Sequence, residues 1–170
     1  MDIKWDAPLK EGQVSNPILE YYNKGLDKEF LSRFSEDDFN SVLNAKAKHQ
    51  LKTWGGSDST AEPHWIGCKK GKPLHTDPRY PRYSWQLILK VDNFCIRGKD
   101  KEETKLEAGM LFLLDTHSPH QLWALSKDAT YYFACSMDSK EYIPMEIAYL
   151  KLHSYVQDNE ILNDTNRIQK

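Results

Sequence analysis

Between residues 64 and 137 the sequence alternates between short apolar segments and turn-forming clusters, and this alternation constrains the fold most. Gly, Pro, Ser and charged residues at 69–73, 98–102 and 126–128 are typical of turns. Seven or eight short strands at such spacing are typical of a β-sandwich or jelly roll. The expected strands are His64–Cys68, Tyr83–Val91, Phe94–Arg97, Lys105–Glu107, Met110–Leu114, Gln121–Leu125 and Ala129–Met137.

Helical patterns flank this β region on both sides. Pro17–Phe34 carries apolar residues three and four positions apart, and Ser35–Asp38 resembles a capping box at the start of another helix. In Glu141–Val156 the apolar residues also follow helical spacing, and Pro144 suits a first helical turn. We therefore expect one mainly β domain over 1–170, with a helical segment at 1–52, a jelly-roll core at 53–138, and a C-terminal helix and tail at 139–170.

Composition argues against several classes of function. The chain has 23 basic and 25 acidic residues, and its net charge of −2 argues against binding to duplex nucleic acid. The longest apolar run, Met110–Leu114, is too short to span a membrane, and no apolar signal segment follows Met1. Three widely spaced cysteines, Cys68, Cys95 and Cys135, are expected to be reduced thiols. We expect a soluble, cytoplasmic protein.

His75, Asp77 and His120 are the residues that best indicate chemistry. Side chains two positions apart on a strand point to the same face, so His75 and Asp77 can bind one metal ion together. Two His and one carboxylate on one face of an octahedron form the facial triad of non-haem Fe(II) enzymes, which leaves the other positions open. His117 is an alternative third ligand or, like Asp115, a hydrogen-bond partner that orients a ligand.

This pattern resembles the 2-oxoglutarate- and Fe(II)-dependent oxygenase superfamily. In that family a double-stranded β-helix carries an H-x-D/E motif, followed by a Gly-led strand and a distal His. The resemblance covers about residues 64 to 137, and rests on His75-Thr76-Asp77 and on the segment from Gly109 to His120. It implies a double-stranded β-helix (jelly-roll or cupin-like) core. It also implies that His75, Asp77 and His120 bind Fe(II) and act in catalysis, with 2-oxoglutarate as the co-substrate.

The resemblance further implies a basic side chain for the distal carboxylate of 2-oxoglutarate. Most family members have an Arg or Lys a short distance after the distal His, where this chain has Thr130. The JmjC-like hydroxylase branch uses a Lys on the strand after the H-x-D motif, and Lys90 resembles that Lys. Arg79 and Arg82 follow the motif directly. The candidate contacts to 2-oxoglutarate are therefore Lys90, Arg82, Arg79 and Thr130.

The activity implied is hydroxylation of an organic substrate, with consumption of O₂ and release of succinate and CO₂. Two alternatives stay open. One is a cupin-type metal enzyme that does not use 2-oxoglutarate. The other is a non-catalytic jelly-roll binding module in which His75 and Asp77 are structural. We expect no membrane partner, and the flanking helices leave a homodimer open. The sequence does not identify the substrate.

Overall fold

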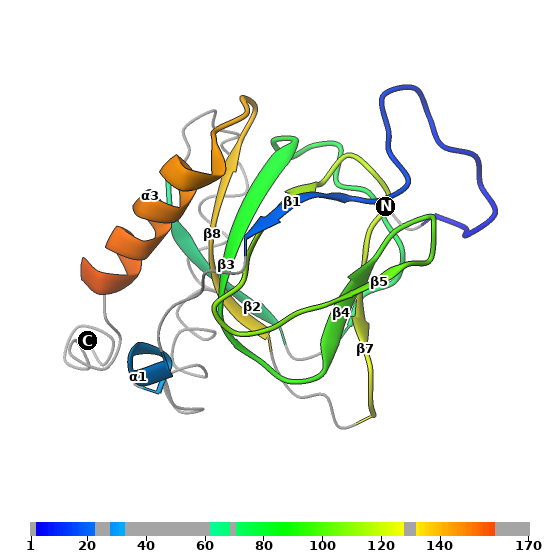
Figure 1. The fold of residues 1–170 in the computed structure, drawn as a ribbon. Coiled ribbons are helices and arrows are strands. Elements are labelled where there is room, and N and C mark those ends of the chain that lie inside the picture. The colour runs from blue at the N-terminus through cyan, green and yellow to red at the C-terminus, as the bar shows by residue number, and fades with distance from the viewer. Residues whose placement is uncertain (1–2, 23–27, 33–61, 69–70, 128–131, 159–170) are drawn as a thin grey trace.

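The computed structural model describes residues 3–22, 28–32, 62–68, 71–127 and 132–158. As predicted, the protein is mainly β, with two antiparallel sheets and a C-terminal helix (Figure 1). The elements in chain order are β1 (Ile18–Tyr22), α1 (Lys28–Leu31), β2 (His64–Cys68), β3 (Tyr83–Val91), β4 (Phe94–Arg97), β5 (Glu103–Lys105), β6 (Leu111–Asp115), β7 (Gln121–Ala124), β8 (Tyr132–Ser139) and α3 (Met145–Asp158).

The strands form two sheets between which the chain repeatedly crosses. The larger sheet has the order β1-β6-β3-β8-β2 and the smaller sheet the order β5-β4-β7. Strand β3 lies at the centre of the larger sheet, where Trp85 pairs with Leu113 of β6 on one side and with Met137 of β8 on the other. From β3 the chain passes to β4 and β5 in the smaller sheet, returns in β6, crosses again in β7 and returns in β8.

Both faces of the larger sheet are buried, which explains the nearly continuous apolar run of β3. Trp85, Leu87 and Leu89 point to one face and pack with Leu152 and other residues of α3. Ile88 points to the other face and packs between the sheets with residues such as Phe94 of β4. Because alternate side chains of a strand point to opposite faces, a strand buried on both sides loses the polar alternation of a surface strand.

The predicted N-terminal helix is wrong over Ile18–Tyr22, because these residues form β1 and pair with β6. Ile18 lies in the core between the sheets, and the ring of Tyr22 contacts that of Tyr149 on α3 at 5.9 Å between centroids. The spacing of apolar residues in this segment fits a helix, but β6 offers a strand edge that only a second strand can pair with. Helix α1 spans Lys28–Leu31. The expected capping box at 35–38 lies outside the described residues.

Other predicted boundaries moved by a few residues. Strand β5 ends at Lys105, and the segment after it forms a turn in which the Met110 N–H donates to the Glu107 carbonyl oxygen at 3.1 Å. Gly109 has a φ of 90° in this turn, a conformation that Gly adopts with little strain. Helix α3 begins at Met145, directly after Pro144, whose carbonyl accepts a hydrogen bond from the Ala148 N–H.

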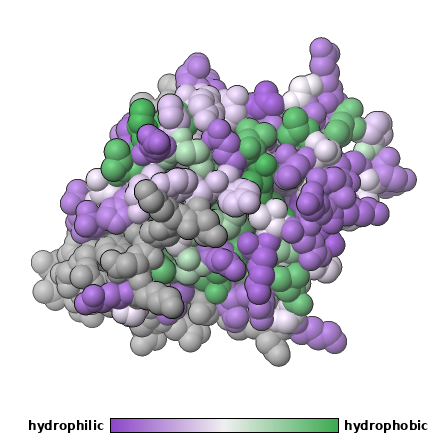
Figure 2. Space-filling model, viewed as in Figure 1, coloured by the Kyte–Doolittle hydropathy of each residue, from purple (hydrophilic) through white to green (hydrophobic). Residues whose placement is uncertain are grey.

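The surface seen in Figure 2 is mixed. Hydrophilic residues gather on the side where β4 and β5 lie, and hydrophobic residues are interspersed toward the centre. Within the described part of the chain, no helix combines the length and apolar character needed to cross a membrane.

Candidate metal centre

His75 and His120 lie side by side because their backbones pair. The His75 N–H donates to the His120 carbonyl oxygen at 3.0 Å, and the His120 N–H donates to that of His75 at 2.9 Å. This antiparallel bridge sits next to the start of β7, so it extends the smaller sheet by one short segment. The two imidazole rings lie 4.3 Å apart between centroids, at an angle of 59°.

Asp77 completes a compact group with the two histidines. Its backbone N–H donates to the Thr116 carbonyl oxygen at 2.9 Å, which fixes the end of the H-x-D segment beside the loop that precedes His120. Its Oδ2 lies 3.2 Å from His120 Nε2 and 3.6 Å from His75 Nε2. One candidate ligand atom from each of the three side chains lies within 4.8 Å of the others. Asp77 and His75 thus share a face, as expected.

Backbone carbonyls fix the orientation of both imidazoles. His75 Nδ1 lies 2.7 Å from the Pro73 carbonyl oxygen, and His120 Nδ1 lies 2.9 Å from that of Ser118. Since a carbonyl oxygen only accepts hydrogen bonds, each Nδ1 carries the proton. Each Nε2 is therefore directed toward Asp77 and, in the neutral imidazole, offers a lone pair. Metal-binding histidines are usually held in this way.

The electrostatics of the group suit a cation. Burial raises the pKa of the Asp77 carboxyl, but hydrogen bonds from His120 and His75 outweigh burial and hold the pKa well below its usual range. The hydrogen bond to Asp77 raises the pKa of His75 above its ordinary 6.5, against an opposing effect of burial. In the metal-free protein, the two imidazoles thus stabilise the Asp77 carboxylate at the position where a metal ion would bind it. Three donor atoms of N, N and O type fit a divalent transition-metal ion.

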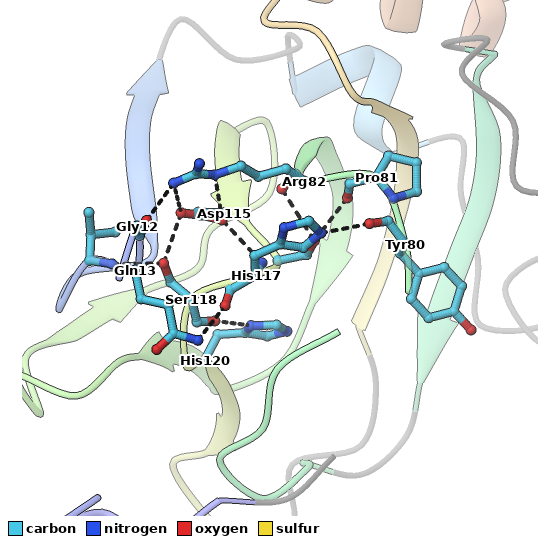
Figure 3. A network of polar contacts seen from close by, with 11 residues as sticks. Gly12, Gln13, Tyr80, Pro81, Arg82, Asp115, His117, Ser118 and His120 are labelled. Carbon is cyan, nitrogen blue, oxygen red and sulfur yellow. Dashed lines mark hydrogen bonds and ion pairs between the residues drawn. The ribbon is translucent and has the colours of Figure 1, made fainter. Parts of the chain in front are cut away.

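A buried carboxylate organises the loop that carries His120 (Figure 3). Asp115 is fully buried, and it accepts hydrogen bonds from Arg82 Nε at 3.2 Å and Arg82 Nη2 at 3.0 Å. It also accepts hydrogen bonds from the His117 N–H at 3.1 Å and the Ser118 hydroxyl at 2.8 Å. Since the Ser118 carbonyl in turn accepts the hydrogen bond from His120 Nδ1, Asp115 supports the orientation of the candidate ligand.

The His117 side chain is directed toward Tyr80 and does not join the group of His75, Asp77 and His120. Its Nε2 lies 2.8 Å from the Tyr80 carbonyl oxygen and must donate to it, so this nitrogen holds a proton and not a metal ion (Figure 3). The three-residue group that could hold a metal contains His120 and not His117.

A cavity of about 240 Å³ opens beside the three side chains, with walls from both sheets. Ile96 and Leu122 come from the smaller sheet, and Ser84, Gln86 and Ser136 come from the larger one. Lys72 also lines the cavity, and it is the one Lys or Arg among the described lining residues.

The structure brings none of the described 2-oxoglutarate candidates to this cavity. The Arg82 guanidinium is bound to Asp115 and to the Gly12 carbonyl oxygen, and the Asp115 hydrogen bond raises its pKa. Arg79 is exposed, and neither it nor the half-buried Lys90 is among the residues that line the cavity. Thr130 lies outside the described residues.

Sequence reasoning missed a polar wall that lines the cavity on the larger sheet. The Tyr132 hydroxyl donates to Gln86 Oε1, Gln86 Nε2 donates to Ser84 Oγ at 3.2 Å, and Ser84 Oγ lies 3.3 Å from Ser136 Oγ. Polar residues at every second position of two apolar strands, 84 and 86 in β3 and 136 and 138 in β8, are the signal that could have revealed this wall.

A second polar pair, His64 and Asp138, also lines the cavity. His64 Nε2 lies 3.8 Å from Asp138 Oδ2, and both side chains are about one-third exposed. His64 lines the cavity together with His75 and His120.

Comparison with known proteins does not assign this site to a family. No protein-family model matches the chain, and no curated protein matches it at a significant level. The candidate metal centre therefore rests on the geometry of His75, Asp77 and His120.

Proposed function

We propose that this protein is an Fe(II)- and 2-oxoglutarate-dependent oxygenase that hydroxylates an organic substrate and releases succinate and CO₂. The observation that carries the proposal is the convergence of His75 Nε2, His120 Nε2 and the Asp77 carboxylate beside a cavity. Two histidines and one carboxylate occupy three positions around iron and leave the others for exchangeable ligands.

The strand order supports a double-stranded β-helix, the fold that this proposal requires. Counting the His75 segment as a short strand beside β7, the smaller sheet has the order β5-β4-β7-His75 segment, and β6-β3-β8-β2 faces it. These are eight antiparallel strands in two sheets, as in a jelly roll. β1 then extends the larger sheet at its β6 edge.

In this reading His75, Asp77 and His120 hold the iron, which supplies the activation of O₂ when it is bound together with 2-oxoglutarate. The Pro73 and Ser118 carbonyls keep both Nε2 atoms directed toward the ion. The apolar walls keep bulk water out, and the polar wall around Ser84 and Gln86 orients bound molecules through neutral hydrogen bonds.

A metal enzyme of the cupin type that does not use 2-oxoglutarate is the second candidate. The observation that favours it is the position of Arg82, Arg79 and Lys90, none of which is among the cavity-lining residues. The two candidates share the metal centre and differ in the molecule that binds beside it.

Succinate release tests the proposal. Protein reconstituted with Fe(II) should convert 2-oxoglutarate to succinate in an O₂-dependent reaction, even slowly without the primary substrate. Asp77→Ala should abolish this reaction. Glu146→Ala, which removes an exposed carboxylate from α3, should leave it unchanged. An Asp77→Ala variant that forms succinate at the wild-type rate would rule out the proposal.

A wild-type protein that binds iron in the His-Asp-His group, and for which 2-oxoglutarate neither binds nor yields succinate, would favour the second candidate.

A further inference from the structure

Lys72 is the cation that the cavity offers to an acidic ligand. Its side chain is exposed and lines the cavity together with His75 and His120. No other Lys or Arg in the described part of the chain lines this cavity.

The backbone at Lys72 is held in place by β7. The Lys72 N–H donates to the Leu122 carbonyl oxygen at 2.8 Å, two residues after the candidate ligand His120. The preceding residue must be small, because a Cβ at Gly71 would lie 2.7 Å from the same carbonyl oxygen. The base of the Lys72 side chain is thus fixed to the strand that follows His120, and its flexible four-carbon stem can place the charge within the cavity.

The cavity wall formed by the larger sheet carries neutral polar side chains, which do not compete with Lys72 for an anionic ligand. Ser84, Gln86, Ser136 and Tyr132 can contact a ligand through hydroxyl and amide groups, and none of them carries a charge that would compete with an anionic ligand for Lys72. The carboxylates that line the cavity are Asp77, which would bind the metal, and Asp138, which lies beside His64. A dicarboxylate that binds the metal through one end would place its other carboxylate near the positive charge of Lys72.

We propose that Lys72 binds the carboxylate of 2-oxoglutarate that lies away from the metal, so that the anchor precedes the H-x-D motif instead of following it. This inference rests on the proposed function. It replaces Lys90, Arg82 and Arg79 with a residue that the structure brings to the cavity, and it assigns Arg82 to the support of Asp115.

Binding of two 2-oxo acids tests this inference independently of turnover. The probes are 2-oxoglutarate and pyruvate, a 2-oxo acid that has no second carboxylate, each titrated into anaerobic Fe(II)-loaded protein. The readout is the visible absorption that a 2-oxo acid produces when it chelates Fe(II). Loss of one charge-assisted hydrogen bond should raise the Kd of Lys72→Gln for 2-oxoglutarate about 10- to 100-fold and leave its Kd for pyruvate unchanged. Lys90→Gln should bind both probes like the wild type.

The possible results separate the two proposals. If wild type binds 2-oxoglutarate and Lys72→Gln binds it equally well, the role of Lys72 is wrong and the oxygenase proposal stands. Equal weakening of both probes would also overturn the role of Lys72, because it would indicate a general disturbance of the site. If iron-loaded wild type binds neither probe, both proposals fail. Fe(II) affinity and circular dichroism of each variant verify that the fold and the metal centre are intact.

Discussion

Arg82→Ala tests whether the buried carboxylate of Asp115 depends on its guanidinium partner. Removing one member of a buried ion pair costs about 3–5 kcal/mol, because the remaining charge is left without compensation. Asp115 is 0% exposed, but the Arg82 side chain is 37% exposed, so water can reach part of the vacated space. The Ser118 hydroxyl and the His117 N–H also continue to donate to the carboxylate. We therefore expect a loss at the lower end, about 3 kcal/mol.

Urea and thermal denaturation at pH 7 measure this loss. For a chain of this size, about 3 kcal/mol corresponds to a fall in Tm of about 6–12 °C. Arg79→Ala is the matched control, because Arg79 is exposed on the same segment and its removal should change stability by less than about 0.5 kcal/mol. Arg82→Ala should also weaken metal binding roughly tenfold through Ser118 and His120. If Arg82→Ala is as stable as Arg79→Ala and binds metal normally, the supporting role of this ion pair is refuted.

Three further predictions concern the turn at Gly109, the packing of helix α3 and the candidate metal centre without a metal ion. Gly109→Ala should cost about 1–2 kcal/mol in urea denaturation, because its φ of 90° is unfavourable for a residue with a Cβ. Leu152→Ala should cost about 2–5 kcal/mol because this side chain is fully buried under the sheet, whereas Leu150→Ala, at a position 64% exposed, should cost less than about 0.5 kcal/mol. Because the hydrogen bond to Asp77 raises the pKa of His75, protonated His75 stabilises the metal-free protein. This stabilisation is fully present below pH 6.5 and is lost as the pH rises through the pKa of His75 in the folded protein. Zn²⁺ affinity should rise over the same pH range because the metal displaces the proton, as titrations at several pH values would verify.

Local sequence patterns were sufficient to predict the strands whose apolar residues and flanking turns are adjacent in the sequence. Strands β2, β3 and β4 have the predicted bounds, because each is an apolar run closed by turn residues. Ile18–Tyr22 could not be assigned in this way. Its apolar spacing fits a helix, and only the pairing with β6, almost a hundred residues later, selects a strand. Long-range pairing of this kind has no local signature in the sequence.

In the candidate site, too, some residues could be predicted from local sequence patterns and others could not. The period of a strand was enough to place His75 and Asp77 on one face. The choice between His117 and His120 depends on the conformation of the loop around them. Asp115 holds this loop by local hydrogen bonds, and its partner Arg82 lies 33 residues earlier in the chain. The anchor candidates Lys90, Arg82 and Arg79 were chosen by their position relative to the motif, which does not predict whether a side chain reaches the cavity.

The most direct test of the central claim is an anaerobic Fe(II) titration of the wild type and four single variants. We expect the wild type and His117→Ala to bind one ion per chain with similar affinity. His75→Ala, Asp77→Ala and His120→Ala each remove a proposed ligand, and should lose affinity by more than about 100-fold, beyond the effect of an outer hydrogen-bond partner. A wild type that binds no metal, or a His120→Ala variant that binds it as well as His117→Ala, would contradict the assignment of the metal centre.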